Sequence, residues 1–128
     1  MYSVFRFVAG PGCTDEALTS VGASLNAVFP GVFKRFDYAG RRFSGTLSSS
    51  DTWNDHLEAA LKFLRKATQV IAVARTQDVM VVIDVAVEPE DCGKAAILSC
   101  DIPPDALFEF GRLGVGFAIS VYSPGASE

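Results

Sequence analysis

Residues 97–123 constrain the fold of this chain more than any other segment, because their pattern leaves few alternatives. An apolar run leads into two prolines ending at Pro104, and an amphipathic stretch then stops at Gly114 before a second apolar run. Proline is tolerated in the first turn of a helix, and glycine commonly follows the last turn. The segment therefore predicts a strand over 95–102, a helix from Pro104 and a last strand over 115–123.

The rest of the chain also alternates between strand and helix patterns. Alternation of apolar and polar residues with a period of two predicts strands, and spacing near 3.6 residues predicts helices. The expected strands cover residues 2–9, 32–38, 41–47 and 79–87, and the expected helices begin after the N-caps Thr14 and Thr52, the second continuing over 68–76 with a bend near Thr68.

The order of these elements, β-α-β-β-α-β-β-α-β, predicts an α+β fold. Hairpins favour antiparallel pairing, and amphipathic helices need a sheet face against which to bury their apolar stripes. We therefore expect a mostly antiparallel sheet of about five or six strands, with three helices packed on one face. We expect one domain over residues 1–124 and a loose tail at 125–128.

Composition limits the classes of function. The chain has 128 residues, of which 49% are hydrophobic and 20% charged, and this balance fits a packed core. Its net charge of -4 gives no overall electrostatic support for binding nucleic acid, so a nucleic-acid partner is not expected. The chain shows no apolar run of about 18 residues and no signal-peptide pattern, which predicts a cytoplasmic protein without membrane association.

Two helical residues stand out from their surroundings. His56, the single histidine, is expected on the polar flank of its helix, exposed or half-packed, because no carboxylate lies one helical turn away to orient it. Phe108 lies off the expected buried stripe of Leu107, Phe110 and Leu113. Phe108 is expected either to pack at the flank of the helix or, beside other exposed apolar residues, to mark a contact surface.

The central helix and the last unit resemble a family of uncharacterised bacterial proteins. The matching pieces are WNDHLEAAL from Trp53, the apolar strand over 79–87, the helix entry at Pro103 and the strand that leads to Tyr122. In the family grouped as domain of unknown function 4279, a helix of the form W…HL…L…L precedes an apolar strand, and a proline-started helix follows. The resemblance covers mainly residues 50–123, and the N-terminal third departs from the family pattern.

The resemblance implies an α+β fold, but it implies no activity, cofactor or site residue, because the family has none established. Some members are thought to lie near toxin systems as immunity-type proteins. For this chain the resemblance therefore implies a protein that blocks a partner by surface complementarity.

The chain lacks the residue sets of the common catalytic and cofactor sites. A serine nucleophile needs a base and an orienting group, and no G-x-S-x-G motif accompanies His56. Cys13, Cys92 and Cys100 show no C-x-x-C spacing, so reduced thiols are expected and a zinc site is not. The glycines over 111–116 follow a helix instead of opening one, which argues against a phosphate loop. We predict no catalytic residue, no metal and no cofactor.

A basic cluster of Lys34, Arg35, Arg41 and Arg42 surrounds the turn of the predicted hairpin. Arg35 and Arg42 are expected across from one another, with Arg41 pointing to the opposite face. A pair of guanidinium groups can hold a carboxylate or a phosphate. The alternative is that these charges solubilise the hairpin and protect an exposed strand edge.

Asp84 is unusual because it lies in the middle of a strand of valines and isoleucine. A carboxylate in such surroundings must be solvated or paired, since its burial alone is costly. Arg6, also in mid-strand, is the expected partner if strands 2–9 and 79–87 adjoin. We expect a structural pair on the sheet face away from the core, and the alternative is a pair that lines a ligand groove.

These observations favour a non-enzymatic protein-binding module, whose partner is another protein or a second copy of the chain. The alternative is a sensor of a small anionic ligand, or a small enzyme, that uses a groove on the sheet. The candidate binding residues are Arg6, Arg35, Arg41, Arg42, Asp84 and Phe108.

Overall fold

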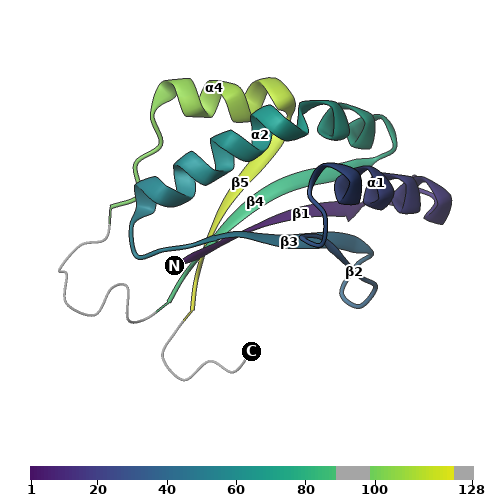
Figure 1. Cartoon of the computed structure of the whole chain (residues 1–128), viewed down its shortest axis with the longest axis horizontal. Coiled ribbons are helices and arrows are strands. Elements are labelled where there is room, and N and C mark those ends of the chain that lie inside the picture. Colours follow the sequence, from purple (N-terminus) through teal and green to yellow (C-terminus); the bar gives the residue numbers. More distant parts are fainter. Residues whose placement is uncertain (89–98, 123–128) are drawn as a thin grey trace.

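The computed structural model describes residues 1–88 and 99–122, which form an open sheet with helices over one of its faces (Figure 1). The helices are α1 (Asp15–Val28), α2 (Trp53–Thr76) and α4 (Pro104–Leu113), and the strands are β1 (Tyr2–Ala9), β2 (Lys34–Phe36), β3 (Arg42–Ser49), β4 (Val79–Val87) and β5 (Val115–Val121).

The strands lie in the order β2-β3-β1-β4-β5. β1 pairs antiparallel with β3 and β4, β2 pairs antiparallel with β3, and β5 runs parallel to β4. The first six elements have the βαββαβ order of the ferredoxin-like motif, and α4 then returns the chain so that β5 adds beside β4. The predicted α+β fold, with a mostly antiparallel sheet and helices on one face, is confirmed.

The predicted strand over 95–102 is absent from the described part of the sheet. Residues 95–98 lie outside the described residues, and residues 99–103 belong to neither a strand nor a helix. β5 is instead the direct neighbour of β4, and a parallel neighbour requires a crossover connection, to which α4 belongs. The predicted tail at 125–128 also lies outside the described residues.

Local signals set the ends of two helices as predicted. Thr14 caps α1, because its Oγ1 accepts a hydrogen bond of 3.1 Å from the backbone N–H of Ala17. Pro104 occupies the first turn of α4, and Gly114 follows its last turn in the left-handed conformation, with φ of 69°.

α2 is a single helix of 24 residues and covers the length that the sequence predicts, including residues 68–76. The helix is continuous through Thr68, whose hydroxyl donates a 2.8 Å hydrogen bond to the Leu64 carbonyl within the helix. Thr52 is the N-cap residue as expected, but its side chain makes no capping bond. Asp55 instead accepts a 2.7 Å hydrogen bond from the Ser50 hydroxyl.

The core lies between the helices and the sheet, and phenylalanine rings fill its centre. The Phe63 ring of α2 stacks on Phe5 and Phe29, with ring centroids 4.1 and 4.6 Å apart. Phe33 and Phe7 surround the same ring at 5.8 and 6.4 Å. Phe63 is buried, so this cluster connects β1, the end of α1 and α2 within the core.

The buried stripe of α4 is Ala106, Phe110 and Leu113, whereas the sequence analysis placed Leu107 in it. Leu107 is 52% exposed. Both stripes fit the 3.6-residue period, so the period alone does not distinguish Leu107 from its neighbour Ala106. In the structure Ala106 faces the core, and Leu107 lies at the surface.

Gly22 of α1 provides a test of how closely the helix layer approaches the sheet. A Cβ atom placed on Gly22 would overlap the Phe43 ring of β3. Glycine costs about 1 kcal/mol relative to alanine in a helix, but overpacking costs about 1–3 kcal/mol. We therefore expect Gly22→Ala to lower the free energy of unfolding, measured by urea denaturation.

The matched control for this substitution is Gly111→Ala in α4. No atom lies within 4 Å of the Cβ position of Gly111, so the substitution should raise the free energy of unfolding by about 0.5–1 kcal/mol. A Gly22→Ala chain that gained as much stability as Gly111→Ala would contradict the close approach of Gly22 and Phe43.

Candidate functional site

No described helix covers the second face of the sheet (Figure 1). Alternate side chains of each strand point to this face, which we call the open face. Its members are Lys34 and Phe36 of β2, Arg42, Ser44 and Thr46 of β3, Tyr2, Val4, Arg6 and Val8 of β1, Met80, Val82, Asp84 and Ala86 of β4, and Gly116, Ala118 and Ser120 of β5.

Arg6 and Asp84 form the predicted ion pair at the centre of the open face. The Nη1 atom of Arg6 donates a hydrogen bond of 2.7 Å to Oδ2 of Asp84. The Ser120 hydroxyl, on the neighbouring strand, lies 2.8 and 2.9 Å from the two carboxylate oxygens. The Asp84 side chain is only 9% exposed, so these partners compensate the loss of its hydration. Ser120 was missed because strand neighbours are not visible in the sequence.

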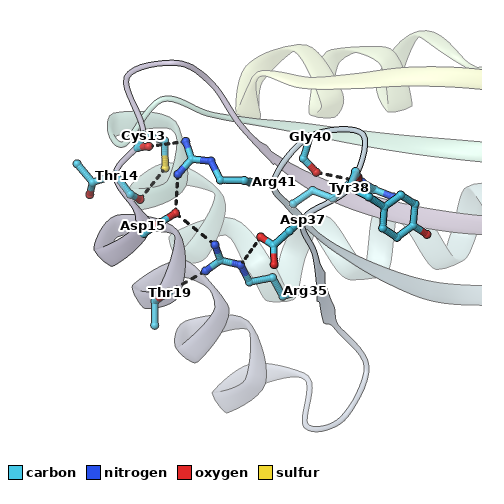
Figure 2. Close-up of polar contacts among 10 residues, drawn as sticks. Cys13, Thr14, Asp15, Thr19, Arg35, Asp37, Tyr38, Gly40 and Arg41 are labelled. Carbon is cyan, nitrogen blue, oxygen red and sulfur yellow. Dashed lines mark hydrogen bonds and ion pairs between the residues drawn. The ribbon is translucent and has the colours of Figure 1, made fainter.

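Arg35 and Arg41 meet on the other side of the hairpin, at the first turn of α1 (Figure 2). Both guanidinium groups donate to Oδ1 of Asp15, at 3.2 Å from Arg35 and 2.6 Å from Arg41. Arg35 also bonds to Asp37 at 3.0 Å, and Arg41 donates to the carbonyl of Cys13 at 2.7 Å. The hydrogen bonds from Arg41 and Arg35 lower the pKa of the Asp15 carboxyl. The carboxylate that these guanidinium groups hold thus belongs to the chain itself.

Arg42 lies apart from the other two arginines, on the open face. Its guanidinium group lies over the rings of Phe36 and Tyr38, at 5.2 and 5.1 Å from their centroids. It also donates to the carbonyls of Tyr38 and Gly40, at 2.6 and 3.0 Å. All of these partners belong to the same hairpin, so Arg42 stabilises the turn.

The prediction that Arg35 and Arg42 lie across from one another is wrong, because the register of β2 and β3 differs by one residue. Arg42 pairs with Phe36, and Arg35 pairs with Phe43. A slip of one residue moves a side chain to the opposite face of a sheet. The arginines predicted to line one groove therefore lie on two faces, with Arg35 facing the helices and Arg6 and Arg42 on the open face.

His56 is fully buried, which corrects the prediction of an exposed or half-packed residue. Its Nε2 lies 2.9 Å from the carbonyl of Ser50, and its Nδ1 lies 2.6 Å from the hydroxyl of Ser48. Because a carbonyl only accepts, we assign the proton to Nε2, and the Ser48 hydroxyl donates to Nδ1. The Ser48 hydroxyl also contacts that of Ser3 on β1. The imidazole therefore has both its hydrogen bonds satisfied and joins α2 to the ends of β3 and β1.

The pair of Ser48 and His56 contains two of the groups needed by a serine nucleophile. The third group is a backbone carbonyl instead of a carboxylate, and a carbonyl does not stabilise an imidazolium ion as a carboxylate does. Burial of His56 also keeps its ring from a substrate. The arrangement thus fits a structural role for this histidine.

Phe108 is exposed on α4 beside another exposed apolar residue. Its side chain is 65% exposed, and the adjacent Leu107 is 52% exposed. Phe108 thus lies beside another exposed apolar residue, as expected for a contact surface, and the two side chains together form a small patch.

The part of the chain that the structure describes contains no group of three or more histidine, cysteine, aspartate or glutamate side chains placed to hold a metal ion. Cys92 lies outside the described residues. Among residues 1–88 and 99–122, no helix combines the length and the apolar character needed to cross a membrane.

Comparisons of the chain with protein-family models, with curated proteins and with solved structures find no match. The function is therefore argued from the geometry of the open face and its surroundings.

Proposed function

We propose that the chain is a non-enzymatic binding module and that its open face packs against the open face of a second copy. The observation that carries this proposal is the character of the uncovered face. Val8 pairs with Met80 across β1 and β4, Val82 follows Met80 on the same face of β4, and Met80 is 64% exposed. Val4 lies on the same face of β1, beyond Arg6. Sheet faces of this kind are normally covered by a helix layer or by another sheet.

The charge of the open face suits contact with an identical face. Arg6 and Asp84 neutralise one another at its centre, so a partner can cover them without leaving a buried charge unpaired. Each copy carries a net charge of -4, so two copies repel one another over most of their surfaces. A central region that is apolar and locally neutral is where this repulsion is smallest.

The size of the open face is also adequate. Four strands of seven to nine residues and the three-residue β2, about 4.8 Å apart, make a flat area of roughly 500 Å² before side chains are counted. Stable interfaces bury about 800 Å² of accessible surface per partner, and projecting side chains make the accessible area larger than the flat one. A face-to-face dimer would thus use most of this face.

Light scattering or sedimentation velocity tests the proposal. We expect a mass twice that of the 13.7 kDa chain, and we expect Met80→Arg to reduce the mass to that of one chain. Phe108→Arg is the matched control, because Phe108 is exposed to a similar extent but lies on α4. It should leave the dimer intact.

Two outcomes would contradict the dimer. A mass of 13.7 kDa for the parent chain at millimolar concentration would exclude it and would direct the search to a different protein, such as the toxin that an immunity-type function requires. Loss of the dimer in Phe108→Arg but not in Met80→Arg would place the contact on α4 instead of the open face.

A further inference from the structure

A hollow of about 500 Å³ lies on the open face toward the β2 edge of the sheet. Its volume falls within the range of small-molecule sites, which runs from about 300 to 1,000 Å³. It is lined by Val4, Gly31, Val32, Lys34, Phe36, Ser44, Gly45 and Thr46.

The hydroxyl of Ser44, a residue that lines this hollow, lacks a hydrogen-bond partner among the described residues. Among the described residues, its Oγ is a buried side-chain oxygen to which no donor or acceptor is bonded. Buried polar groups are almost always bonded, and an exception calls for an explanation such as a ligand. Ser44 itself is half-buried, so rotation about its Cα–Cβ bond can turn the hydroxyl into the hollow.

Lys34 is a lysine near Ser44 whose ammonium group has no partner among the described residues. The two residues are paired across β2 and β3, and Arg6 is paired with Ser44 on the other side. Arg6 is held by Asp84, and Arg42 by the rings and carbonyls of the hairpin. Within the described residues, Lys34 has no ion pair or hydrogen bond, and an unpaired ammonium group attracts an anion.

The remainder of the lining is suited to an apolar group. Val4 and Val32 contribute aliphatic surface, and Phe36 contributes an aromatic ring. The Thr46 hydroxyl, which has no hydrogen bond to another described residue, adds a second neutral donor. Lys34 is one positive charge next to hydroxyl donors, so the site suits a ligand with one negative charge better than a ligand with two. The apolar walls favour a ligand that also has an apolar part.

We propose that this hollow binds a small carboxylate with a compact apolar body. The carboxylate lies between the ammonium group of Lys34 and the hydroxyl of Ser44, and the apolar body lies against Phe36 and Val4. All of the lining residues come from one copy of the chain. This inference therefore goes beyond the proposed dimer and needs no second copy, and a dimer through the open face would cover the hollow and compete with the ligand.

Isothermal titration calorimetry with 3-phenylpropionate tests the site, with 3-phenylpropionamide as a neutral analogue and inorganic phosphate as a dianion. We expect the carboxylate to bind at least tenfold more tightly than the amide, because only the carboxylate makes a charge-assisted bond. Phosphate, which lacks an apolar body, should bind more weakly than the carboxylate.

Substitutions of single residues show where the carboxylate binds. Lys34→Gln should weaken carboxylate binding about tenfold, and Ser44→Ala should weaken it severalfold. Lys62→Gln is the matched control, because Lys62 is an exposed lysine of α2 that lines other hollows on the helix side. It should leave the affinity unchanged. Met80→Arg, which should separate the two copies and uncover the open face, should bind the carboxylate at least as tightly as the parent chain.

The assignment would be overturned by equal affinity for the carboxylate and the amide, or by no measurable affinity for the carboxylate. It would also be overturned by unchanged binding in Lys34→Gln, or by binding that is lost in Lys62→Gln instead. Loss of binding in Met80→Arg would exclude a site formed by one copy. A monomeric parent chain that binds the carboxylate would refute the dimer alone and leave the carboxylate site in place.

Discussion

Replacing Phe63 with alanine is expected to lower the free energy of unfolding by about 3–5 kcal/mol, the cost of removing a buried aromatic ring. Phe63 is 3% exposed and stacks on Phe5 and Phe29 at 4.1 and 4.6 Å. The substitution would leave a cavity where β1, α1 and α2 meet, and the neighbouring rings are too large to rotate into it. Guanidinium denaturation followed by circular dichroism measures the loss.

Two further variants keep this prediction testable if Phe63→Ala does not fold. Phe63→Leu retains most of the volume, and its cost should stay below about 1.5 kcal/mol. Phe108→Ala removes an identical side chain that is 65% exposed, so its effect should stay within about 0.5 kcal/mol. A loss of stability in Phe63→Ala no larger than that in Phe108→Ala would show that the aromatic cluster is not the centre of the core.

The features that the sequence predicted correctly depend on neighbouring residues or on a strong physical demand. The Thr14 cap and the proline start and glycine end of α4 are local, since each uses only residues within one helical turn. The Arg6–Asp84 pair was predictable although its members are 78 positions apart, because a carboxylate in an apolar strand needs a partner.

The hairpin register was not predictable because it depends on the conformation of the turn. Phe36 pairs with Arg42, so residues 37–41 form the turn, with Ala39 and Gly40 both at positive φ. A turn longer or shorter by one residue would fit the same alternation of apolar and polar residues, and it could bring Arg35 and Arg42 to the same face. Sequence patterning alone does not distinguish these lengths.

The polar residues of the candidate site were missed for a different reason. Ser44, Ser120 and His56 look like surface residues in the sequence, because polar side chains at alternating or flanking positions are common there. Ser120 bonds to Asp84, 36 positions away, whereas His56 bonds to Ser48 and to the Ser50 carbonyl, which precede it by eight and six positions. The strand order that places Ser120 beside Asp84 follows from packing of the whole chain.

The Arg6–Asp84 pair should show a large energetic coupling. Arg6→Met is expected to lower the free energy of unfolding by about 2–4 kcal/mol, because it leaves a nearly buried carboxylate without its cation. Ser120 would remain as a neutral donor to that carboxylate, and it compensates only part of the charge. Urea denaturation near neutral pH measures the effect.

The double variant Arg6→Met/Asp84→Val distinguishes loss of the pair from loss of packing. With both charges removed, the free energy of unfolding should return to within about 1 kcal/mol of the parent value. Arg112→Met breaks an exposed pair with Glu109 of similar length, 2.8 Å against 2.7 Å, and should cost less than about 1 kcal/mol.

The outcome of this cycle also bears on the open face. If Arg6→Met costs no more than Arg112→Met, Asp84 must be hydrated or paired elsewhere, and the neutral centre on which the proposed dimer depends does not exist. If the double variant regains stability and also dimerises, the pair is dispensable for the contact, because the apolar residues around it are then sufficient for association. The double variant has a larger apolar area on the open face, which by itself should strengthen association. If this variant regains stability but remains monomeric, the ion pair contributes to the specificity of the contact.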